Sequence, residues 1–126
     1  MRYISHAILI ALVSSALAGC SQPNTSGRQP MLPPLSESAQ KVRYATVQQS
    51  LEQQESGRPL AWNSPDGLSR GVVTPLGTTR SALYGWCRDY EERIETGGHV
   101  YPLVGVACRE SGPDWLVLDV RPVATG

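Results

Sequence analysis

Two Cys-Arg pairs are the residues of this chain whose types and spacing suggest chemistry. Cys87 and Arg88 lie in LYGWCRDY, and Cys108 and Arg109 lie in VGVACRES. A cysteine beside a cation can be a reactive thiolate, because the positive charge lowers the thiol pKa. Two cysteines can also bind a metal ion or form a disulfide. The choice among the three depends on the compartment of the protein and on the elements that position the pairs.

The N-terminus predicts export. Arg2 gives a basic start, residues 7–18 are almost purely apolar, and small residues end this run. The run is shorter than the roughly 20 apolar residues that span a bilayer, and the pattern is typical of a secretory signal peptide. The alternative is a buried core helix, but the Pro- and Ser-rich sequence that follows would not continue one. We therefore expect a signal peptide over residues 1–19.

The sequence Leu-Ala-Gly-Cys at residues 17–20 resembles the lipobox of bacterial lipoproteins. The resemblance implies cleavage before Cys20 and attachment of lipid to its sulfur and its new amino group. More than one acyl chain makes such an anchor stable. Ser21 follows, where Asp retains many Gram-negative lipoproteins in the inner membrane, so the resemblance favours the cell outer membrane. The first expected partner is the lipid bilayer, reached through acylated Cys20.

The mature chain is expected to be a tether followed by one small domain. Residues 20–35 combine the lipidated cysteine with a Pro-, Ser-, Gln- and Gly-rich segment, which predicts a flexible tether. The domain is expected over residues 36–121 and a short tail over residues 122–126. Loss of Arg2 with the signal leaves 10 basic against 11 acidic residues. Nucleic-acid binding is excluded, because it needs a basic surface.

A helix is expected over residues 38–55, where Gln, Glu, Ala and Leu favour helix without interruption. Ser36 or Ser38 would cap its start, and Gly57 followed by Pro59 would stop it. The apolar residues at helical spacing are Val42, Tyr44, Ala45, Val47 and Leu51. This stripe predicts docking onto the following domain, since small domains need much apolar burial. A role as a partner-binding helix is the alternative.

Residues 59–121 change to β patterns, with short strand candidates between turn clusters such as residues 63–67 and 111–114. Pro75 limits the strand around residues 71–74 to an edge or an end. We predict an α+β fold that is mostly β, with one helix before a small antiparallel meander or open barrel of 4–5 strands. The chain contains no Phe, so the large core side chains must come from Trp62, Trp86, Trp115, Tyr84, Tyr90 and Tyr101.

A Gly-Gly pair at residues 97–98 predicts a two-residue hairpin turn between strands 82–96 and 99–109. Partners across such a turn have numbers that add up to 195, so Cys87 and Cys108 face each other. They fall on a non-hydrogen-bonded pair, with Cα atoms roughly 4.5 Å apart, which is within disulfide range. Disulfides persist in the compartment that an export signal implies. We expect one disulfide, stabilising the domain by roughly 3 kcal/mol.

This register also mixes apolar and acidic side chains on one strand face. The residues concerned are Val100, Val104, Val106, Asp89, Glu91 and Glu95. Because a slip of one residue exchanges the two faces of a strand, a β-bulge between the turn and the cysteines is the alternative arrangement. The strand register of the hairpin therefore stays open, whereas the disulfide is expected with either arrangement.

A zinc site and a thiol nucleophile are the alternatives to the disulfide. Zinc usually takes four closely spaced Cys and His ligands, but Cys87 and Cys108 are 21 residues apart, and the mature chain has one histidine, His99. His99 would lie at the far end of the hairpin from Cys87. We expect no metal and no cofactor. Motifs of the G-x-S-x-G, H-E-x-x-H and phosphate-loop kinds are also absent, so we expect no enzyme.

Arg88 and Arg109 are expected on the strand face opposite the cysteines. Their first role would be solvated pairing with nearby carboxylates, which contributes little to stability. Their second role would be a paired cationic spot for an anionic partner, with Trp62 and Tyr90 as further candidate partner-binding residues. We favour the first role. The carboxylates within reach are Asp89, Glu91, Glu92 and Glu110.

Several short motifs occur in order: WNSPDG at 62–67, GVVTP at 71–75, CRDY at 87–90, GG at 97–98, GVACR at 105–109 and GPDW at 112–115. Together they resemble the C-terminal domain of the 17-kilodalton outer-membrane surface antigen family of rickettsiae and other proteobacteria. The likeness covers about residues 40–118 and implies a surface lipoprotein without established catalytic residues. Many members carry a glycine-zipper segment before this domain, in the place where this chain has its tether and helix.

These observations predict a non-enzymatic outer-membrane lipoprotein, structural or antigenic in role, on the periplasmic or the surface side of the membrane. The alternative is a membrane-tethered periplasmic binding module for peptidoglycan, a glycan or an envelope protein.

Overall fold

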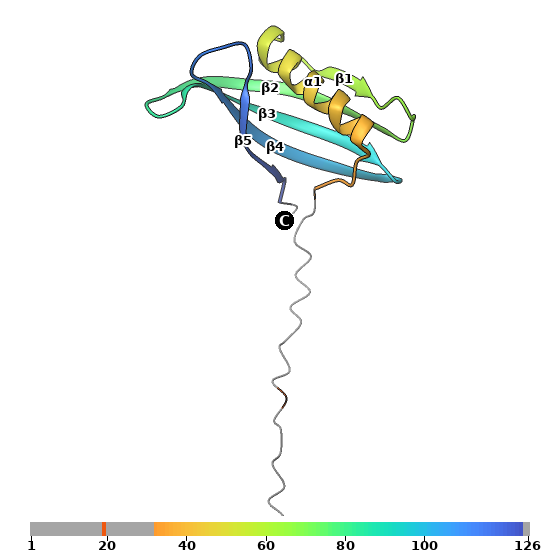
Figure 1. Ribbon diagram of the computed structural model, residues 1–126. Coiled ribbons are helices and arrows are strands. Elements are labelled where there is room, and N and C mark those ends of the chain that lie inside the picture. Colours follow the sequence, from red (N-terminus) through yellow and green to blue (C-terminus); the bar gives the residue numbers. More distant parts are fainter. Residues whose placement is uncertain (1–18, 20–31, 125–126) are drawn as a thin grey trace, which may run out of the picture.

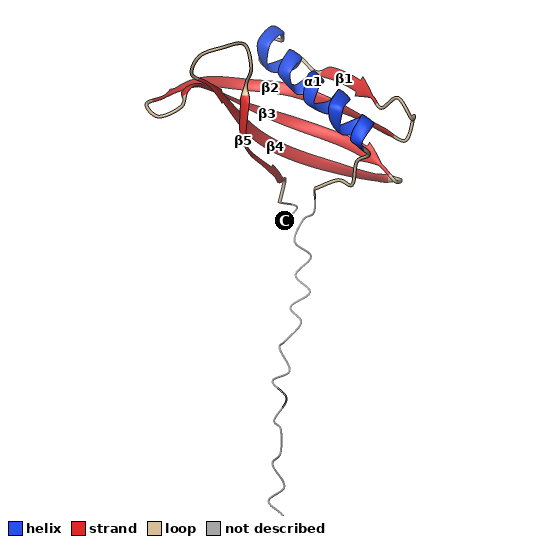
Figure 2. Cartoon of the chain, in the orientation of Figure 1, coloured by secondary structure: helices blue, strands red, loops and turns tan. Residues whose placement is uncertain are grey.

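The computed structural model describes Gly19 and residues 32–124 (Figure 1). The predicted signal peptide other than Gly19, Cys20 and most of the predicted tether lie outside the described residues. In the described part, one helix lies against a sheet of five strands (Figure 2). Among the described residues there is no helix that is both long enough and apolar enough to cross a membrane.

The sheet is an open antiparallel meander in which each strand pairs with its neighbours in sequence. The strands are β1 (Leu60–Asn63), β2 (Ser69–Ser81), β3 (Gly85–Thr96), β4 (His99–Arg109) and β5 (Leu116–Pro122), in the spatial order β1-β2-β3-β4-β5. The predicted α+β class is confirmed, and the sheet is not closed into a barrel.

The helix α1 (Glu37–Gln53) lies across one face of the sheet (Figure 1). The Ser36 hydroxyl caps its start by accepting a hydrogen bond from the Ala39 N–H. The helix ends before the predicted Gly57, because Gln54 is already extended. Ala39, Val47 and Leu51 are buried in the core that the helix shares with the sheet. The predicted docking of the helix onto the domain is therefore confirmed.

The face that α1 turns toward the sheet differs from the predicted stripe. Tyr44 and Ala45 are exposed, while the polar Thr46 and Ser50 are buried. The Thr46 hydroxyl donates a hydrogen bond to the Val42 carbonyl one helical turn earlier. This bond accounts for the inward position of Thr46, whereas the buried Ser50 hydroxyl has no hydrogen-bond partner among the described residues. The prediction for Tyr44 and Ala45 was wrong.

Pro75 does not end its strand, because β2 continues six residues further to Ser81. The strand β1 pairs with β2 only as far as Val73, so Pro75 has an edge on that side and its missing N–H removes nothing from β1. On the other side Pro75 lies opposite Tyr90, and the β2–β3 register shifts between Pro75 and Thr78. The strand β2 lies between β1 and β3 in the sheet, so the prediction that this strand is at an edge or an end was wrong; Pro75 is tolerated because it lies beyond β1 and beside the register shift.

Three of the six predicted aromatic core residues fill the core, and two lie in solvent. Trp62, Tyr90 and Trp115 are buried, and Tyr101 packs partly buried against them. Trp86 and Tyr84 are each 50% exposed, so their prediction as core residues was wrong. They lie at the β2–β3 turn, beyond the end of the helix, and neither belongs to the core cluster of the described residues.

Two of the buried rings lie over glycines of the neighbouring strand. Trp62 is the direct partner of Gly71, and Tyr90 is the direct partner of Gly105. A Cβ atom added at Gly71 would meet the Trp62 Nε1 atom at 2.6 Å, and one added at Gly105 would meet the Tyr90 hydroxyl at 2.6 Å. Both glycines therefore leave space for a ring across the strand pair.

We expect Gly105→Ala to lower the free energy of unfolding by about 2 kcal/mol, because the buried Tyr90 ring must shift from its site. Gly71→Ala should act in the same way on Trp62. The matched control is Gly77→Ala, since Gly77 is also in the sheet, has no positive φ and has open space around it. Urea unfolding measures all three. Equal midpoints for Gly105→Ala and Gly77→Ala would contradict the packing argument.

Candidate functional site

Cys87 and Cys108 form the predicted disulfide, with an S–S distance of 2.06 Å and Cα atoms 4.0 Å apart. They are direct partners in the β3–β4 ladder, and Thr96 pairs with His99 across the two-residue turn. No register shift interrupts this ladder, so the predicted register is confirmed and the alternative bulge was wrong. The mixed valine and carboxylate face is the face of the sheet that α1 does not cover. The thiols are thus joined and are not free to bind zinc or to attack a substrate.

Arg88 lies on the opposite face, buried beneath the end of α1, with 8% of its surface exposed. Its guanidinium donates to the carbonyls of Leu51 at 2.5 Å, Gln54 at 2.7 Å and Leu76 at 3.4 Å. These bonds tie the helix C-terminus to β2 and β3. The expectation that Arg88 pairs in solvent with carboxylates was wrong, because the carbonyls at the end of α1 lack partners within the helix and accept its hydrogen bonds inside the domain.

Arg109 takes a different position, above the Trp115 ring at 4.7 Å from the ring centroid. It forms an ion pair with Glu52 of α1, a carboxylate that also accepts a hydrogen bond from the Trp115 indole N–H at 3.1 Å. The Trp115 hydrogen bond and the Arg109 guanidinium hold the pKa of Glu52 below its usual value. Arg109 thus pairs with a carboxylate as predicted, but with Glu52 rather than with a neighbour in sequence.

The remaining candidate partner-binding residues, Trp62 and Tyr90, belong to the core. Trp62 is 3% exposed and Tyr90 is 1% exposed. Burial, and then the nearby Glu92 carboxylate, raise the pKa of the Tyr90 hydroxyl above its usual value. Of the four candidates, only Arg109 has a side chain with substantial access to solvent.

A buried ion pair between α1 and β3 was not predicted. Arg43 binds both carboxylate oxygens of Glu92, at 2.7 and 3.0 Å, and the Glu92 side chain is fully buried. The alternation of residues along a strand could have predicted it. Tyr90, Glu92 and Ile94 are every second residue of β3, so their side chains lie on the same face of the sheet, and burying Tyr90 and Ile94 also buries Glu92.

Gln48 is a second residue that the sequence did not single out. Its amide donates to the Trp115 carbonyl at 2.7 Å and accepts from the Trp115 N–H at 2.8 Å. This pair of bonds fixes the segment before β5 to the helix. No sequence pattern distinguishes Gln48 from the other glutamines of α1.

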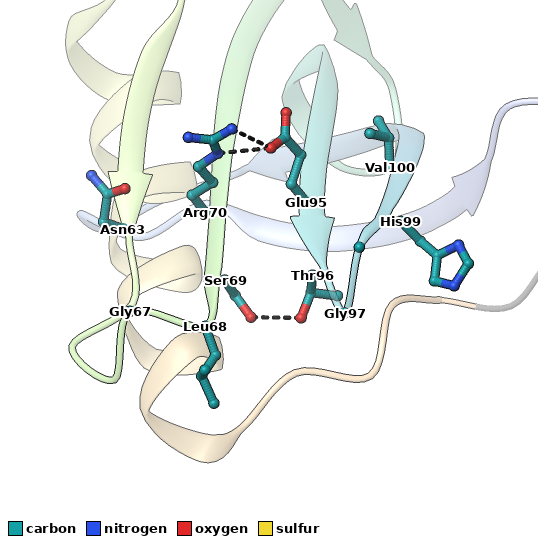
Figure 3. A pocket seen from close by; sticks show the side chains of 11 residues that line it. Asn63, Gly67, Leu68, Ser69, Arg70, Glu95, Thr96, Gly97, His99 and Val100 are labelled. Atoms are coloured by element: carbon teal, nitrogen blue, oxygen red, sulfur yellow. Dashed lines mark hydrogen bonds and ion pairs between the residues drawn. The ribbon is translucent and has the colours of Figure 1, made fainter.

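A hollow of about 430 Å³ lies where the β1–β2 and β3–β4 turns meet (Figure 3). Its polar groups mostly bond to one another: Arg70 pairs with Glu95 at 2.6 Å, and the Ser69 and Thr96 hydroxyls are 2.8 Å apart. His99 lines the rim but points away from these groups in Figure 3, with its ring against that of Tyr101. The hollow therefore places no base beside a nucleophile.

The described residues contain no group of three or more His, Cys, Asp or Glu side chains close enough to hold a metal ion. Cys20, the predicted lipidation site, lies outside the described residues. The chemistry that remains on the described domain is the disulfide and the internal arginine contacts.

Three curated proteins illustrate what the chain is similar to. The proteins called 17 kDa surface antigen from Rickettsia conorii and Rickettsia japonica are each 32% identical to it over 85 residues, and that from Rickettsia bellii is 31% identical over 85 residues. Each match covers 68% of this chain and 54% of the relative. The chain thus spans about half the length of the curated relatives it matches. No family model and no solved structure matches the chain.

Proposed function

This chain is a relative of the 17 kDa surface antigens, as its motifs predicted, and from this relationship we propose that it is a non-enzymatic lipoprotein of the bacterial outer membrane with a structural or antigenic role. The names of the relatives support a place in the cell envelope. The signal peptide and lipobox of the sequence support export and a lipid anchor on Cys20.

The contacts that three arginines make inside the domain support a structural role for the protein. Arg88 binds helix carbonyls, Arg43 binds Glu92, and Arg109 binds Glu52. Each contact joins α1 to the sheet, so these groups hold the domain together instead of meeting at one reactive point. Such a domain, closed by a disulfide, is suited to persist outside the cytoplasm.

The alternative, a tethered module that binds peptidoglycan, a glycan or an envelope protein, has less support. It relied on Arg88, Arg109, Trp62 and Tyr90 as a surface for a partner. Three of these residues are buried, and Arg109 already pairs with Glu52. A partner would therefore have to use a different surface.

The lipid anchor is tested by Cys20→Ala in a Gram-negative host. We expect the variant to accumulate at precursor size, to take up no labelled palmitate and to leave the outer-membrane fraction, since the acylated sulfur is gone. Globomycin, which blocks the lipoprotein signal peptidase, should also cause the precursor of the unmodified chain to accumulate.

The control is Cys87→Ala, which removes a cysteine but leaves the lipobox intact and should still be labelled with palmitate. Normal processing and palmitate labelling of the Cys20→Ala variant would contradict the proposal that the chain is a lipoprotein.

A further inference from the structure

The turn between β2 and β3 forms a projecting tip of residues 80–86 (Figure 1). Its large apolar side chains point into solvent: Leu83 is 77% exposed, and Tyr84 and Trp86 are each 50% exposed. Adjacent exposed groups of this size mark an interaction surface more often than scattered single residues do. None of these three side chains belongs to the hydrophobic core cluster of the described domain.

The tip has a defined conformation. The Ser81 hydroxyl accepts hydrogen bonds from the N–H groups of Leu83 and Tyr84, both at 3.2 Å. Gly85 has φ +77°, where a side chain would collide with the Arg109 backbone. The Arg80 guanidinium lies over the Trp86 ring, 5.3 Å from its centroid. The apolar groups are therefore presented outward by an ordered turn.

We propose that the tip is a second membrane contact, which places Leu83 and the rings of Tyr84 and Trp86 in the headgroup region of the bilayer that holds acylated Cys20. The proposal rests on the lipid anchor of the proposed function. An apolar apex flanked by Tyr and Trp is the composition found at membrane–water interfaces, where each ring buries its body and keeps its polar atom wet. Arg80 beside them is placed to meet lipid phosphate.

A bilayer fits the tip better than a protein partner does. A stable protein interface buries about 800 Å² on each partner, whereas the tip offers three large apolar side chains on a convex turn. A bilayer needs no complementary pocket and accepts a few inserted side chains. A domain already tethered to the membrane meets it at high effective concentration, so a weak contact is sufficient.

The length of the chain before the domain allows this contact. The helix starts at the end of the sheet opposite the tip, because Ser36 bonds to Asp66 in the β1–β2 turn. The β3 strand, at ~3.3 Å per residue, separates the two ends by roughly 40 Å. Residues 21–35, if extended at ~3.1 Å per residue, reach roughly 45 Å. The sheet can therefore lie along the bilayer with its tip at the surface.

The test uses the lipidated chain reconstituted into vesicles of phosphatidylethanolamine and phosphatidylglycerol, with bromine on the acyl chains as a contact quencher of tryptophan. We expect brominated vesicles to quench the Trp86 share of the emission, since Trp62 and Trp115 are buried. Trp86→Phe should abolish this quenching. Leu83→Ser should reduce it by about half, because the apex no longer inserts.

The matched control is Leu68→Ser, which removes an apolar side chain that is 74% exposed at the opposite end of the sheet. It should leave the quenching as in the unmodified chain. If the unmodified chain does not float with vesicles, the lipid anchor fails and the tip proposal falls with it. If it floats but Trp86 is not quenched, or if Leu83→Ser and Leu68→Ser behave alike, only the tip contact is overturned. Crosslinking from Leu83 to an envelope protein, without quenching, would also overturn it.

Discussion

Replacing Cys87 and Cys108 together with alanine is expected to lower the free energy of unfolding by about 3 kcal/mol. The disulfide joins residues 21 apart in sequence, and a closed loop of this size restricts the unfolded chain by about that amount in the chain-entropy model. A small domain has only about 5–15 kcal/mol in total. The variant should therefore unfold at a distinctly lower urea concentration.

Urea unfolding followed by circular dichroism measures this effect, and the unmodified chain in reductant should match the double variant. The slope of free energy against urea should also rise in the variant, since an unlinked unfolded chain exposes more surface. Cys87→Ala alone is the control, because it breaks the bridge while changing half as many side chains. If the oxidised and reduced chains unfold at the same midpoint, the disulfide is not a main source of stability.

The hairpin that carries this disulfide could be predicted in detail from sequence. Two consecutive glycines both adopt φ > 0, at +58° for Gly97 and +75° for Gly98, which is the backbone that a two-residue turn requires. The turn then fixes every partner along both strands, including Arg93 opposite Pro102. The turn chemistry alone indicated the register that the structure has, but the sequence left a β-bulge open as the alternative, and only the uninterrupted ladder excludes it.

The distribution of side chains between core and solvent was harder to predict. Trp86 and Tyr84 have the composition of core residues, but they lie beyond the end of the helix and stay exposed. Whether a ring is covered depends on the length and placement of α1, which the strand pattern does not contain. The same cause left Tyr44 in solvent and placed Thr46 inward.

The burial of charged side chains was the other feature that was not predicted from the sequence. Arg88 and Glu92 alternate with Tyr90 and Ile94 on the covered face of β3. A charge on that face is expected to be unfavourable unless it is paired and hydrogen-bonded. The partners of these charged side chains come from α1, about 40 residues earlier in the sequence. They can therefore be identified only when the position of the helix on the sheet is known. The favoured interpretation of Arg88 as a solvated residue failed for this reason.

Arg88 is the point where the helix and the sheet depend on each other. The last turn of α1 contains no basic residue, although the C-terminus of a helix carries a partial negative charge and unpaired carbonyls. Arg88 supplies both the positive charge and the donors from β3, through its bonds to Leu51 and Gln54. It therefore acts as the C-terminal cap that the helix sequence itself does not provide.

Arg88→Met should lower the free energy of unfolding by about 3 kcal/mol. The substitution keeps much of the side-chain volume but leaves the Leu51 and Gln54 carbonyls without donors in a partly dry site, and each unpaired group costs about 1–3 kcal/mol. Urea unfolding measures the total loss. Amide hydrogen exchange should show that the last turns of α1 lose protection more than the centre of β3 does.

The control is Arg93→Met on the same strand, since Arg93 is exposed on the opposite face and its loss should change stability by less than about 0.5 kcal/mol. Arg88→Lys separates charge from geometry, because an ammonium keeps the charge but lacks the planar fork that reaches two carbonyls together. We expect it to fall between the other two variants. If Arg88→Met is as stable as Arg93→Met, the bonds from Arg88 do not hold the helix, and the second half of the Cys87-Arg88 pair has no structural role.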